Sequence, residues 1–230
     1  MSYYKIGDLE QYFKHYKKSV REPRKFWGKI AEENFVWYQA WDKVFDFDME
    51  KHDIKWFTDG KLNIVKNCID RHLSKRGEKT ALIFEPNDIN EQAQIISYNE
   101  LYVRVAKMAN VLKSQGIDKG DRVCIYLPMI PELAIAMLAC ARIGAIHSVI
   151  FAGFSAEAIK TRVEDCGAKM VITSDGGFRG AKTIQLKNIV DDAIKDLSAV
   201  EKVLVVKRTN EAVQMKEGRD LWLAPLYEAA

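Results

Sequence analysis

The sequence predicts an α/β protein with a mostly parallel sheet and flanking helices, preceded by a helical and mixed N-terminal region. Short apolar runs alternate with helix-length segments between residues 122 and 206. One helical segment, residues 131–143, is apolar on nearly all sides, which is typical of a helix buried between two layers. Near residue 177, an apolar run is followed by a glycine loop with two cations, an arrangement with which α/β proteins hold phosphate.

Residues 1–76 form the first of two predicted domains and are rich in aromatic side chains. Pro23 suits the first turn of a helix, because its fixed backbone angle matches that position. Phe26, Trp27 and Ile30 follow at helical spacing and predict a buried stripe. These aromatic residues are interpreted as packing rather than as a ligand site.

The boundary between the two domains is placed in a short polar stretch. A helix over residues 63–73 closes the first domain. The polar residues 74–79 follow it and are the best candidate for a linker. Residues 77–230 therefore make up the second domain.

The second domain opens with a predicted hairpin and a capped helix. Residues 80–85 and 94–97 are expected to pair as strands. Ser97 and Glu100 have the spacing of a capping box, in which each side chain binds the backbone N–H of the other residue. The helix should end at Gly116, because glycine readily takes the left-handed conformation that closes a helix.

Beyond Gly116 the pattern is a regular alternation of strand and helix. Short strands joined by single helices imply right-handed crossovers and therefore a parallel sheet. The expected strands are residues 122–127, 145–150, 169–173 and 202–206, and the expected helices are residues 131–143, 156–165 and 186–197.

The loops after three of these strands should lie at one edge of the sheet, where open parallel sheets bind ligands. They are residues 127–131, 151–155 and 175–182. If the strands before the last two loops are neighbours, Phe151 or Phe154 comes within reach of the cations of the third loop. An aromatic surface beside paired cations suits a base and its phosphate. The alternative is that both phenylalanines belong to the core.

The third loop contains the strongest candidates for anion binding. Gly176, Gly177 and Gly180 allow backbone N–H groups to approach a ligand, while Arg179 and Lys182 add positive charge. If the segment after Gly177 is helical, Arg179 and Lys182 share one face of that helix. The alternative is a solvated turn with two surface cations, because short glycine motifs often arise by chance.

Two catalytic motifs come close to a match and fail. Residues 176–183 would be a Walker A loop if position 181 were glycine, but it is Ala181, and the next strand has no acidic residue for magnesium. Residues 153–157 resemble a nucleophile elbow, but Glu157 replaces its final glycine. Ser155 is therefore interpreted as a helix N-cap. The sequence favours neither a P-loop NTPase nor a serine hydrolase.

Composition excludes several further classes. A net charge of +3 does not indicate a nucleic-acid-binding protein. The basic residues near the N-terminus are interpreted as the solvent-exposed face of amphipathic helices. The start lacks a secretory pattern and the longest apolar run is too short for a membrane span, so a cytoplasmic protein is expected. The four separated cysteines are expected to be reduced, and the four histidines have no metal-ligand spacing. Asp191 and Asp192 are expected to be solvated.

Two blocks of the sequence resemble one known family. They are RVCIYLPMIPELAIAMLACARIGAIHSVIFAGFSAEAIKTRVEDCGAKMVITSDGGFRGAK and KWFTDGKLNIVKNCIDRHL. Both are similar to the AMP-forming acetyl-coenzyme A synthetases of the acyl-adenylate-forming superfamily. The similarity runs from about Tyr12 to Trp222. It implies the N-terminal region of that family followed by the first, incomplete part of its AMP-binding domain.

The resemblance implies a ligase reaction for a longer parent enzyme. Acetate and ATP, with Mg²⁺ as cofactor, form acetyl-adenylate, and the acetyl group then passes to coenzyme A. The segments that hold ATP, the acyl group and Mg²⁺ are expected beyond Ala230, so this segment should need the remainder of its chain and be inactive alone. A propionyl-CoA or other short-chain acyl-CoA synthetase, and a non-catalytic fragment that binds coenzyme A, stay open as alternatives.

The resemblance also implies a site within this segment. The 3′-phosphate of coenzyme A would contact residues 179–182, and its adenine would lie beside Phe151. Relatives often have arginine where this chain has Lys182. Arginine can bind a phosphate through two hydrogen bonds, whereas Lys182 would make a single ionic contact. No catalytic or metal-binding residue is expected here. The implied coenzyme A-binding residues are Arg179, Gly180, Ala181, Lys182, Phe151 and Gly153.

Overall fold

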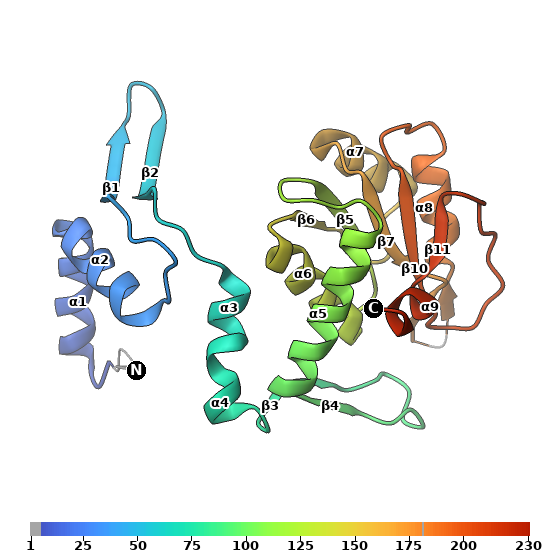
Figure 1. Ribbon diagram of the computed structural model, residues 1–230, viewed down its shortest axis with the longest axis horizontal. Coiled ribbons are helices and arrows are strands. Elements are labelled where there is room, and N and C mark those ends of the chain that lie inside the picture. The colour runs from blue at the N-terminus through green and yellow to red at the C-terminus, as the bar shows by residue number, and fades with distance from the viewer. Residues whose placement is uncertain (1–5, 181) are drawn as a thin grey trace. The chain divides into compact units, whose positions relative to one another are not determined.

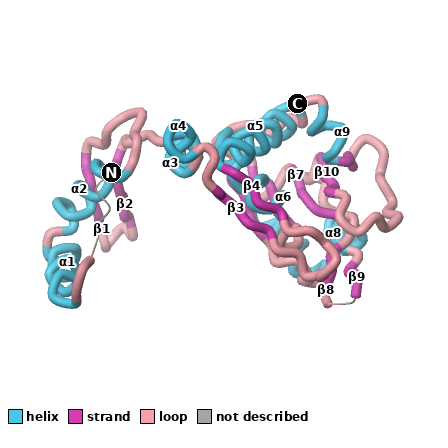
Figure 2. The backbone as a smooth tube through the Cα atoms, turned by 90° about the horizontal axis from the view of Figure 1, so that it is seen from below, coloured by secondary structure: helices cyan, strands magenta, loops and turns pink. Residues whose placement is uncertain are grey.

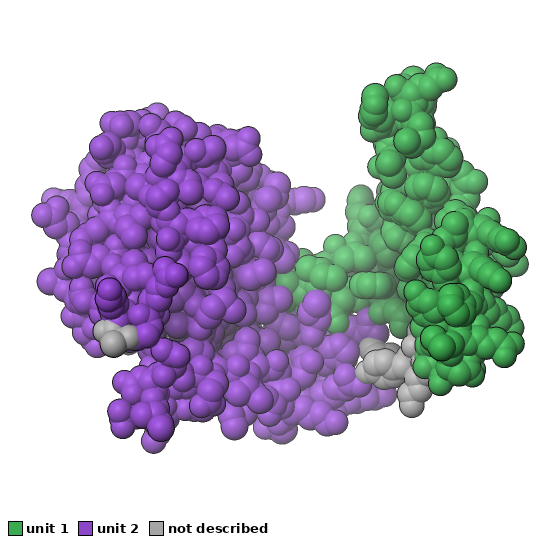
Figure 3. All heavy atoms as spheres, turned by 180° about the vertical axis from the view of Figure 1, so that it is seen from behind, with its two compact units in different colours: residues 1–67 green, residues 68–230 purple. Residues whose placement is uncertain are grey.

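The computed structural model describes residues 6–180 and 182–230 and contains two compact units. Unit 1 comprises Met1–Asn67 and unit 2 comprises Cys68–Ala230 (Figure 3). The polar residues 74–79 lie in unit 2, where α4 (Leu73–Arg76) is connected to β3 (Thr80–Phe84).

Unit 1 contains helices and an antiparallel hairpin (Figure 1). Pro23 occupies the first turn of its second helix, as predicted, and Phe26 is buried there. Trp27 is 41% exposed, so the predicted buried stripe is formed only in part. The hairpin, which was not predicted, has Phe45 stacked on Trp56 with 4.2 Å between the ring centroids. The elements of unit 1 are α1 (Leu9–Arg21), α2 (Pro23–Asn34), β1 (Lys43–Asp48) and β2 (Asp53–Thr58).

The segment predicted as one helix over residues 63–73 is divided into short elements. These are α3 (Ile64–Cys68), η1 (Asp70–His72) and α4. Asp70 accepts hydrogen bonds from Arg142 of the later helix α6 (Pro131–Ile143), the shorter at 2.6 Å. This ion pair attaches the start of unit 2 to the helices that cover its sheet.

The hairpin and capped helix that follow are confirmed. Strand β3 pairs antiparallel with β4 (Gln94–Ser97), which leads into α5 (Tyr98–Ser114). The Ser97 hydroxyl accepts a hydrogen bond from the N–H of Glu100 at 3.2 Å, and the Glu100 carboxylate accepts one from the N–H of Ser97 at 2.7 Å. Gly116 has φ +82°, the left-handed conformation expected just beyond the helix.

Unit 2 is built on a five-stranded parallel sheet in the order β11-β10-β7-β5-β6. The predicted strand and helix alternation is confirmed to within a few residues at most ends. Strand β11 and helix α9 were not predicted, because each is very short. The remaining elements are β5 (Arg122–Tyr126), β6 (Ile146–Val149), α7 (Ala156–Cys166), β7 (Met170–Ser174), β8 (Gly177–Arg179), β9 (Lys182–Ile184), α8 (Leu186–Ile194), β10 (Lys202–Val206), β11 (Asp220–Trp222) and α9 (Leu223–Glu228).

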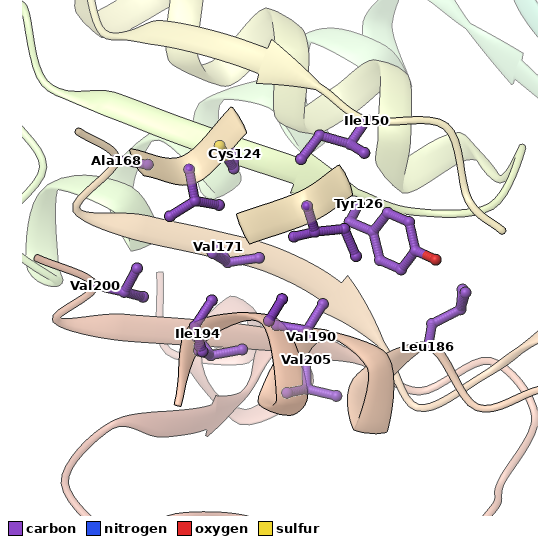
Figure 4. Close-up of a cluster of buried hydrophobic side chains, with 14 residues drawn as sticks. Cys124, Tyr126, Ile150, Ala168, Val171, Leu186, Val190, Ile194, Val200 and Val205 are labelled. Atoms are coloured by element: carbon purple, nitrogen blue, oxygen red, sulfur yellow. The ribbon is translucent and has the colours of Figure 1, made fainter. Parts of the chain in front are cut away.

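Helices cover both faces of the sheet, which explains why its strands are apolar without alternation. Helix α6 lies between α5 and the strands β5 and β6, as its all-round apolar sequence predicts. On the opposite face, α7 and α8 pack over β5, β7 and β10 (Figure 4). Val171, Val190 and Val205 come from three different elements and are fully buried in this layer.

The cysteines are free thiols, as predicted. Cys124 and Cys140 are fully buried in the core of unit 2. Burial raises the pKa of the Cys140 thiol to about 12 and raises that of Cys124 as well, with the neighbouring Cys166 adding to the effect. Both thiols therefore stay protonated and unreactive at neutral pH.

A buried charge network joins α8 to β11. The Nζ of Lys187, whose side chain is fully buried, lies 2.6 Å from Asp191 Oδ2 and 2.7 Å from Asp220 Oδ2, and also donates to the carbonyl of Gln214 at 3.0 Å. Arg219 contacts the same two carboxylates. The expectation that Asp191 is merely solvated is therefore wrong. Two cations and two carboxylates balance each other, which makes the burial of Lys187 tolerable.

Candidate functional site

The sheet has a topological switch point between β5 and β7. From β5 the chain crosses to β6 on one side, and from β7 it continues to β10 on the other side. The helices that follow these two strands therefore lie on opposite faces of the sheet. The loops after β5 and β7 diverge, and a crevice opens at the carboxyl end of the strands.

A cavity of about 830 Å³ occupies this place. Its walls come from the end of β6, the loops after β5 and β6, the hairpin of β8 and β9 that follows β7, the end of β3 with the loop between β3 and β4, and Arg208 after β10. The three predicted loops thus meet around one cavity, large enough for a cofactor. Residues that line it include Phe84, Asp88, Leu127, Pro128, Met129, Phe151, Ala152, Gly177, Phe178, Arg179, Gly180 and Arg208.

The two candidate cations lie on a hairpin and not at the start of a helix, so that expectation is wrong. Strands β8 and β9 pair antiparallel, with Arg179 directly opposite Lys182. Gly180 has φ +59°, which suits glycine at the hairpin end, and Ala181 lies outside the described residues. Cross-strand partners point to the same face, so both cations still lie together. Both are exposed.

This cation pair is unfavourable without a negative partner. Like charges directly opposite each other destabilise a two-stranded ribbon. Among the described residues, no salt bridge to a carboxylate is found for Arg179 or Lys182. An anion placed between the two side chains would relieve their repulsion, so the geometry favours binding of a group such as phosphate.

Phe151 lies on the cavity wall and is 67% exposed, and Phe154 is 40% exposed. Their ring centroids are 5.9 Å apart. The alternative that both belong to the core is therefore wrong. The strands β6 and β7 are not neighbours, since β5 lies between them. Phe151 and Arg179 nevertheless line the same cavity, because that cavity extends from the loop after β6 across the loop after β5 to the hairpin that follows β7.

Tyr126, the last residue of β5, fixes the loop that carries these phenylalanines. Its side chain is fully buried, and its hydroxyl accepts a hydrogen bond from the N–H of Gly153 at 3.0 Å and donates one to the carbonyl of Phe154 at 2.9 Å. Figure 4 shows the ring in the core with its oxygen at the edge of the cluster. Burial raises the pKa of Tyr126, so its hydroxyl stays protonated and can donate.

We predict that Tyr126→Phe lowers the free energy of unfolding of unit 2 by about 1 kcal/mol, because water can replace part of the two lost hydrogen bonds. Hydrogen exchange at the amide of Gly153 should become faster at the same time. Chemical denaturation together with exchange measured by NMR checks both effects. Tyr102→Phe serves as the control, since Tyr102 lies on the surface of α5. Unchanged protection of Gly153 would contradict this role for the hydroxyl.

Two further residues shape the cavity, and the sequence did not single them out. The fully buried Asp175 follows β7 and accepts hydrogen bonds from the N–H groups of Gly176, Arg208 and Thr209 at 2.7, 2.7 and 3.0 Å. Gly176 has no room for a side chain, because an added Cβ would lie 2.6 Å from Thr209 Oγ1. Asp175 could have been noticed in the sequence, because it is an acidic residue directly after a buried strand.

Arg208 follows β10 at the same edge of the sheet. Its guanidinium forms two hydrogen bonds of 2.6 Å with the carboxylate of Glu91, in the loop between β3 and β4. The Arg208 hydrogen bond holds the pKa of Glu91 below its usual value. Figure 2 shows β8 and β9 near the end of the β3–β4 hairpin. The loop after β10 belongs to the set of carboxyl-end loops, and that topology was the signal for Arg208.

Of the six predicted residues, the cavity lining contains Phe151, Arg179 and Gly180. Gly153 and Lys182 are exposed and are not part of that lining. Gly153 has φ +111°, a conformation that favours glycine, and it is held by Tyr126.

The Ser155 hydroxyl accepts a hydrogen bond from the N–H of Ala158 at 3.4 Å, which confirms it as the N-cap of α7. The described part of the chain has no group of three or more His, Cys, Asp or Glu side chains that could hold a metal ion.

No helix within residues 6–180 and 182–230 has both the length and the apolar character that a membrane crossing needs.

A parallel α/β sheet with a cofactor-sized cavity at its switch point defines a class of nucleotide- and cofactor-binding proteins. Comparison with known families makes the assignment definite. The chain belongs to the AMP-binding enzyme family, whose family model matches residues 69–225. A second family model, described as the acetyl-coenzyme A synthetase N-terminus, matches residues 12–68. The two matches meet within one residue of the division between units 1 and 2.

Individual relatives agree with this assignment. The chain is 52% identical over 219 residues to an acetyl-coenzyme A synthetase of Desulfatibacillum aliphaticivorans, which covers 94% of this chain and 33% of the relative. It is 50% identical over 227 residues to the acetyl-coenzyme A synthetase of Syntrophobacter fumaroxidans, and the match covers 97% of this chain and 34% of that relative. It is 48% identical over 213 residues to the acetyl-coenzyme A synthetase of Alkalilimnicola ehrlichii, and this match covers 93% of this chain and 33% of that relative. The chain thus spans about a third of the length of these curated relatives.

Proposed function

We propose that this chain is the N-terminal part of an acetate–CoA ligase and supplies one wall of its coenzyme A site. The observation that carries the proposal is the exposed pair of Arg179 and Lys182, of which Arg179 lines the cavity together with Phe151. Coenzyme A combines an adenine ring with a 3′-phosphate. An exposed aromatic ring and a nearby pair of cations suit these two groups.

In this proposal each side chain has a distinct role. Arg179 binds two phosphate oxygens with its planar guanidinium, whereas Lys182 contributes a point charge from the opposite strand. Phe151 offers its exposed ring to the adenine. Gly180 allows the hairpin end to approach the phosphate, and Ala181 and Gly153 are proposed as further contacts of the coenzyme. Electrostatic attraction then orients the coenzyme while its thiol arm stays free to reach the acyl-adenylate.

The reaction of the whole enzyme is likewise a proposal. Acetate is proposed as the acid because the relatives are named acetyl-coenzyme A synthetases. ATP is the activating substrate, with Mg²⁺ neutralising its phosphates, and the match to the AMP-binding family supports this choice. The products would be acetyl-CoA, AMP and pyrophosphate. The catalytic steps are expected to need the two thirds of the relatives' length that this chain does not span.

We predict that Arg179→Ala weakens binding of coenzyme A by about tenfold, since a hydrogen bond between charged groups contributes about 1.5 kcal/mol or more. Binding of dephospho-coenzyme A, which lacks the 3′-phosphate, should change much less. Isothermal titration of this chain with both ligands measures the difference. Lys195→Ala is the matched control, because Lys195 is exposed and does not line the cavity. If the unaltered chain binds coenzyme A and dephospho-coenzyme A with equal affinity, the proposed site for the 3′-phosphate is contradicted.

A turnover assay separates binding from catalysis. The chain of 230 residues, supplied with acetate and ATP, is expected to release no pyrophosphate. The longer enzyme with Arg179→Ala should keep pyrophosphate release during adenylation but show a raised KM for coenzyme A. An unchanged KM would exclude Arg179 from the coenzyme A site.

A further inference from the structure

Arg208 connects three segments that are far apart in the sequence. Its two terminal nitrogens bind both oxygens of Glu91 at 2.6 Å. Its Cζ lies 5.2 Å from the ring centroid of Phe178 in β8 and 5.6 Å from that of Phe84 at the end of β3. One guanidinium therefore contacts the hairpin β8–β9, the strand β3 and the loop before β4. Arg208 itself lines the cavity.

The backbone of Arg208 is fixed independently of its side chain. Its N–H donates to Asp175 Oδ1 at 2.7 Å, at the point where β7 passes into the residues before β8. The hairpin is thus anchored at its base by Asp175 and along its side by the contact of Phe178 with the guanidinium. Phe178 directly precedes Arg179, so the position of one ring fixes the strand that presents the cation.

The geometry of the ion pair requires arginine. The Arg208 side chain is 20% exposed and that of Glu91 is 27% exposed, which sets the pair apart from a fully solvated one. A guanidinium binds a carboxylate through two parallel hydrogen bonds and contacts aromatic rings with its planar faces. A lysine at position 208 would keep the charge, but it would lose the two parallel hydrogen bonds to Glu91 and the contacts of a planar guanidinium with the aromatic rings.

We infer that Arg208 and Glu91 are positioning residues that hold the hairpin β8–β9 so that Arg179 and Lys182 face the 3′-phosphate of coenzyme A. This inference rests on the proposed function. Arg208 acts through Phe178, and its own charge is already balanced by Glu91.

The test compares Arg208→Lys and Glu91→Gln with the unaltered chain of 230 residues. Isothermal titration gives the affinities for coenzyme A and dephospho-coenzyme A. The affinity for coenzyme A divided by that for dephospho-coenzyme A should fall by about tenfold in both variants, comparable to the effect of removing the residues that orient metal ligands in metal sites. Hydrogen exchange without ligand should become faster at residues 177–184, while the amides of β5 and β7 keep their protection.

Arg142→Lys is the matched control. Arg142 forms a similar guanidinium–carboxylate pair with Asp70, with 21% and 31% of the side chains exposed, and lies over the ring of Tyr102, but it does not line the cavity. This substitution should leave the affinity ratio unchanged.

The outcomes distinguish the inference from the proposed function. If the unaltered chain binds both ligands with equal affinity, this result contradicts both the proposed phosphate site and the positioning role of Arg208 and Glu91. If it prefers coenzyme A and Arg208→Lys keeps the full preference, the positioning role alone is overturned. A loss of preference together with equal loss of protection in β5 and β7 shows general destabilisation, and this also overturns it. A lowered ratio with faster exchange confined to the hairpin supports the inference.

Discussion

Replacing Lys187 with methionine is expected to lower the free energy of unfolding of unit 2 by about 3 kcal/mol, the lower end of the effect of breaking a buried ion pair. Lys187 is fully buried, and its three donors are used by Asp191, Asp220 and the carbonyl of Gln214. Methionine has a similar length and fills the same space, so the effect isolates the charge. Arg219 still contacts both carboxylates, which limits the loss.

The pH dependence of this effect follows from Asp220. Burial raises the pKa of its carboxyl group, but hydrogen bonds from Arg219 and Lys187 outweigh burial and hold the pKa below its usual value. A carboxyl group with a lowered pKa stabilises the folded state above its unfolded pKa of about 3.9, and this contribution is lost as the pH falls through the folded pKa. The difference between Lys187→Met and the unaltered chain should therefore become smaller below about pH 4.

Native-state hydrogen exchange at amides of β7 and β10 measures this stability within unit 2, separately from unit 1. Lys195→Met provides the control, because it makes the same chemical change at an exposed position just after α8 and should cost less than about 0.5 kcal/mol. A Lys187→Met variant as stable as this control would show that the network contributes little. Retention of the full difference down to the lowest pH at which both chains stay folded would contradict the role given to Asp220.

The sequence predicts the layers of unit 2 better than the order of its strands. Apolar runs such as residues 122–126 and 202–206 indicate strands buried on both faces, and the structure confirms them. Local pattern does not state which strand lies beside which. The position of β5 between β6 and β7 depends on packing between helices on opposite faces, and this order creates the switch point.

The candidate site was predictable in part for the same reason. The glycines and cations of residues 176–182 indicated a loop for anions, but strands of three residues are too short to show the alternation that identifies a hairpin. The pairing of Arg208 with Glu91 joins residues 117 positions apart, and no local pattern reports such a contact. The burial of Lys187 was equally unpredictable from the sequence, because a lysine on an amphipathic helix is normally exposed.

Asp175→Asn is expected to lower the free energy of unfolding of unit 2 by about 2 to 3 kcal/mol, because hydrogen bonds to a charged acceptor are stronger than those to a neutral one. The fully buried carboxylate accepts from the N–H groups of Gly176, Arg208 and Thr209. Asparagine keeps the shape but turns one acceptor oxygen into a donor. Thr209 N–H lies 3.2 Å from Asp175 Oδ2, so an amide nitrogen there would set two donors against each other.

The consequence should extend from stability to binding. Asp175 joins the end of β7 to the residues after β10, so its loss loosens the base of the hairpin that carries Arg179. Chemical denaturation gives the stability change, and isothermal titration with coenzyme A gives the affinity change. Asp192→Asn, the same substitution at an exposed position of α8, should alter neither. A stable Asp175→Asn variant with full affinity would mean that the surrounding backbone holds the hairpin without this carboxylate.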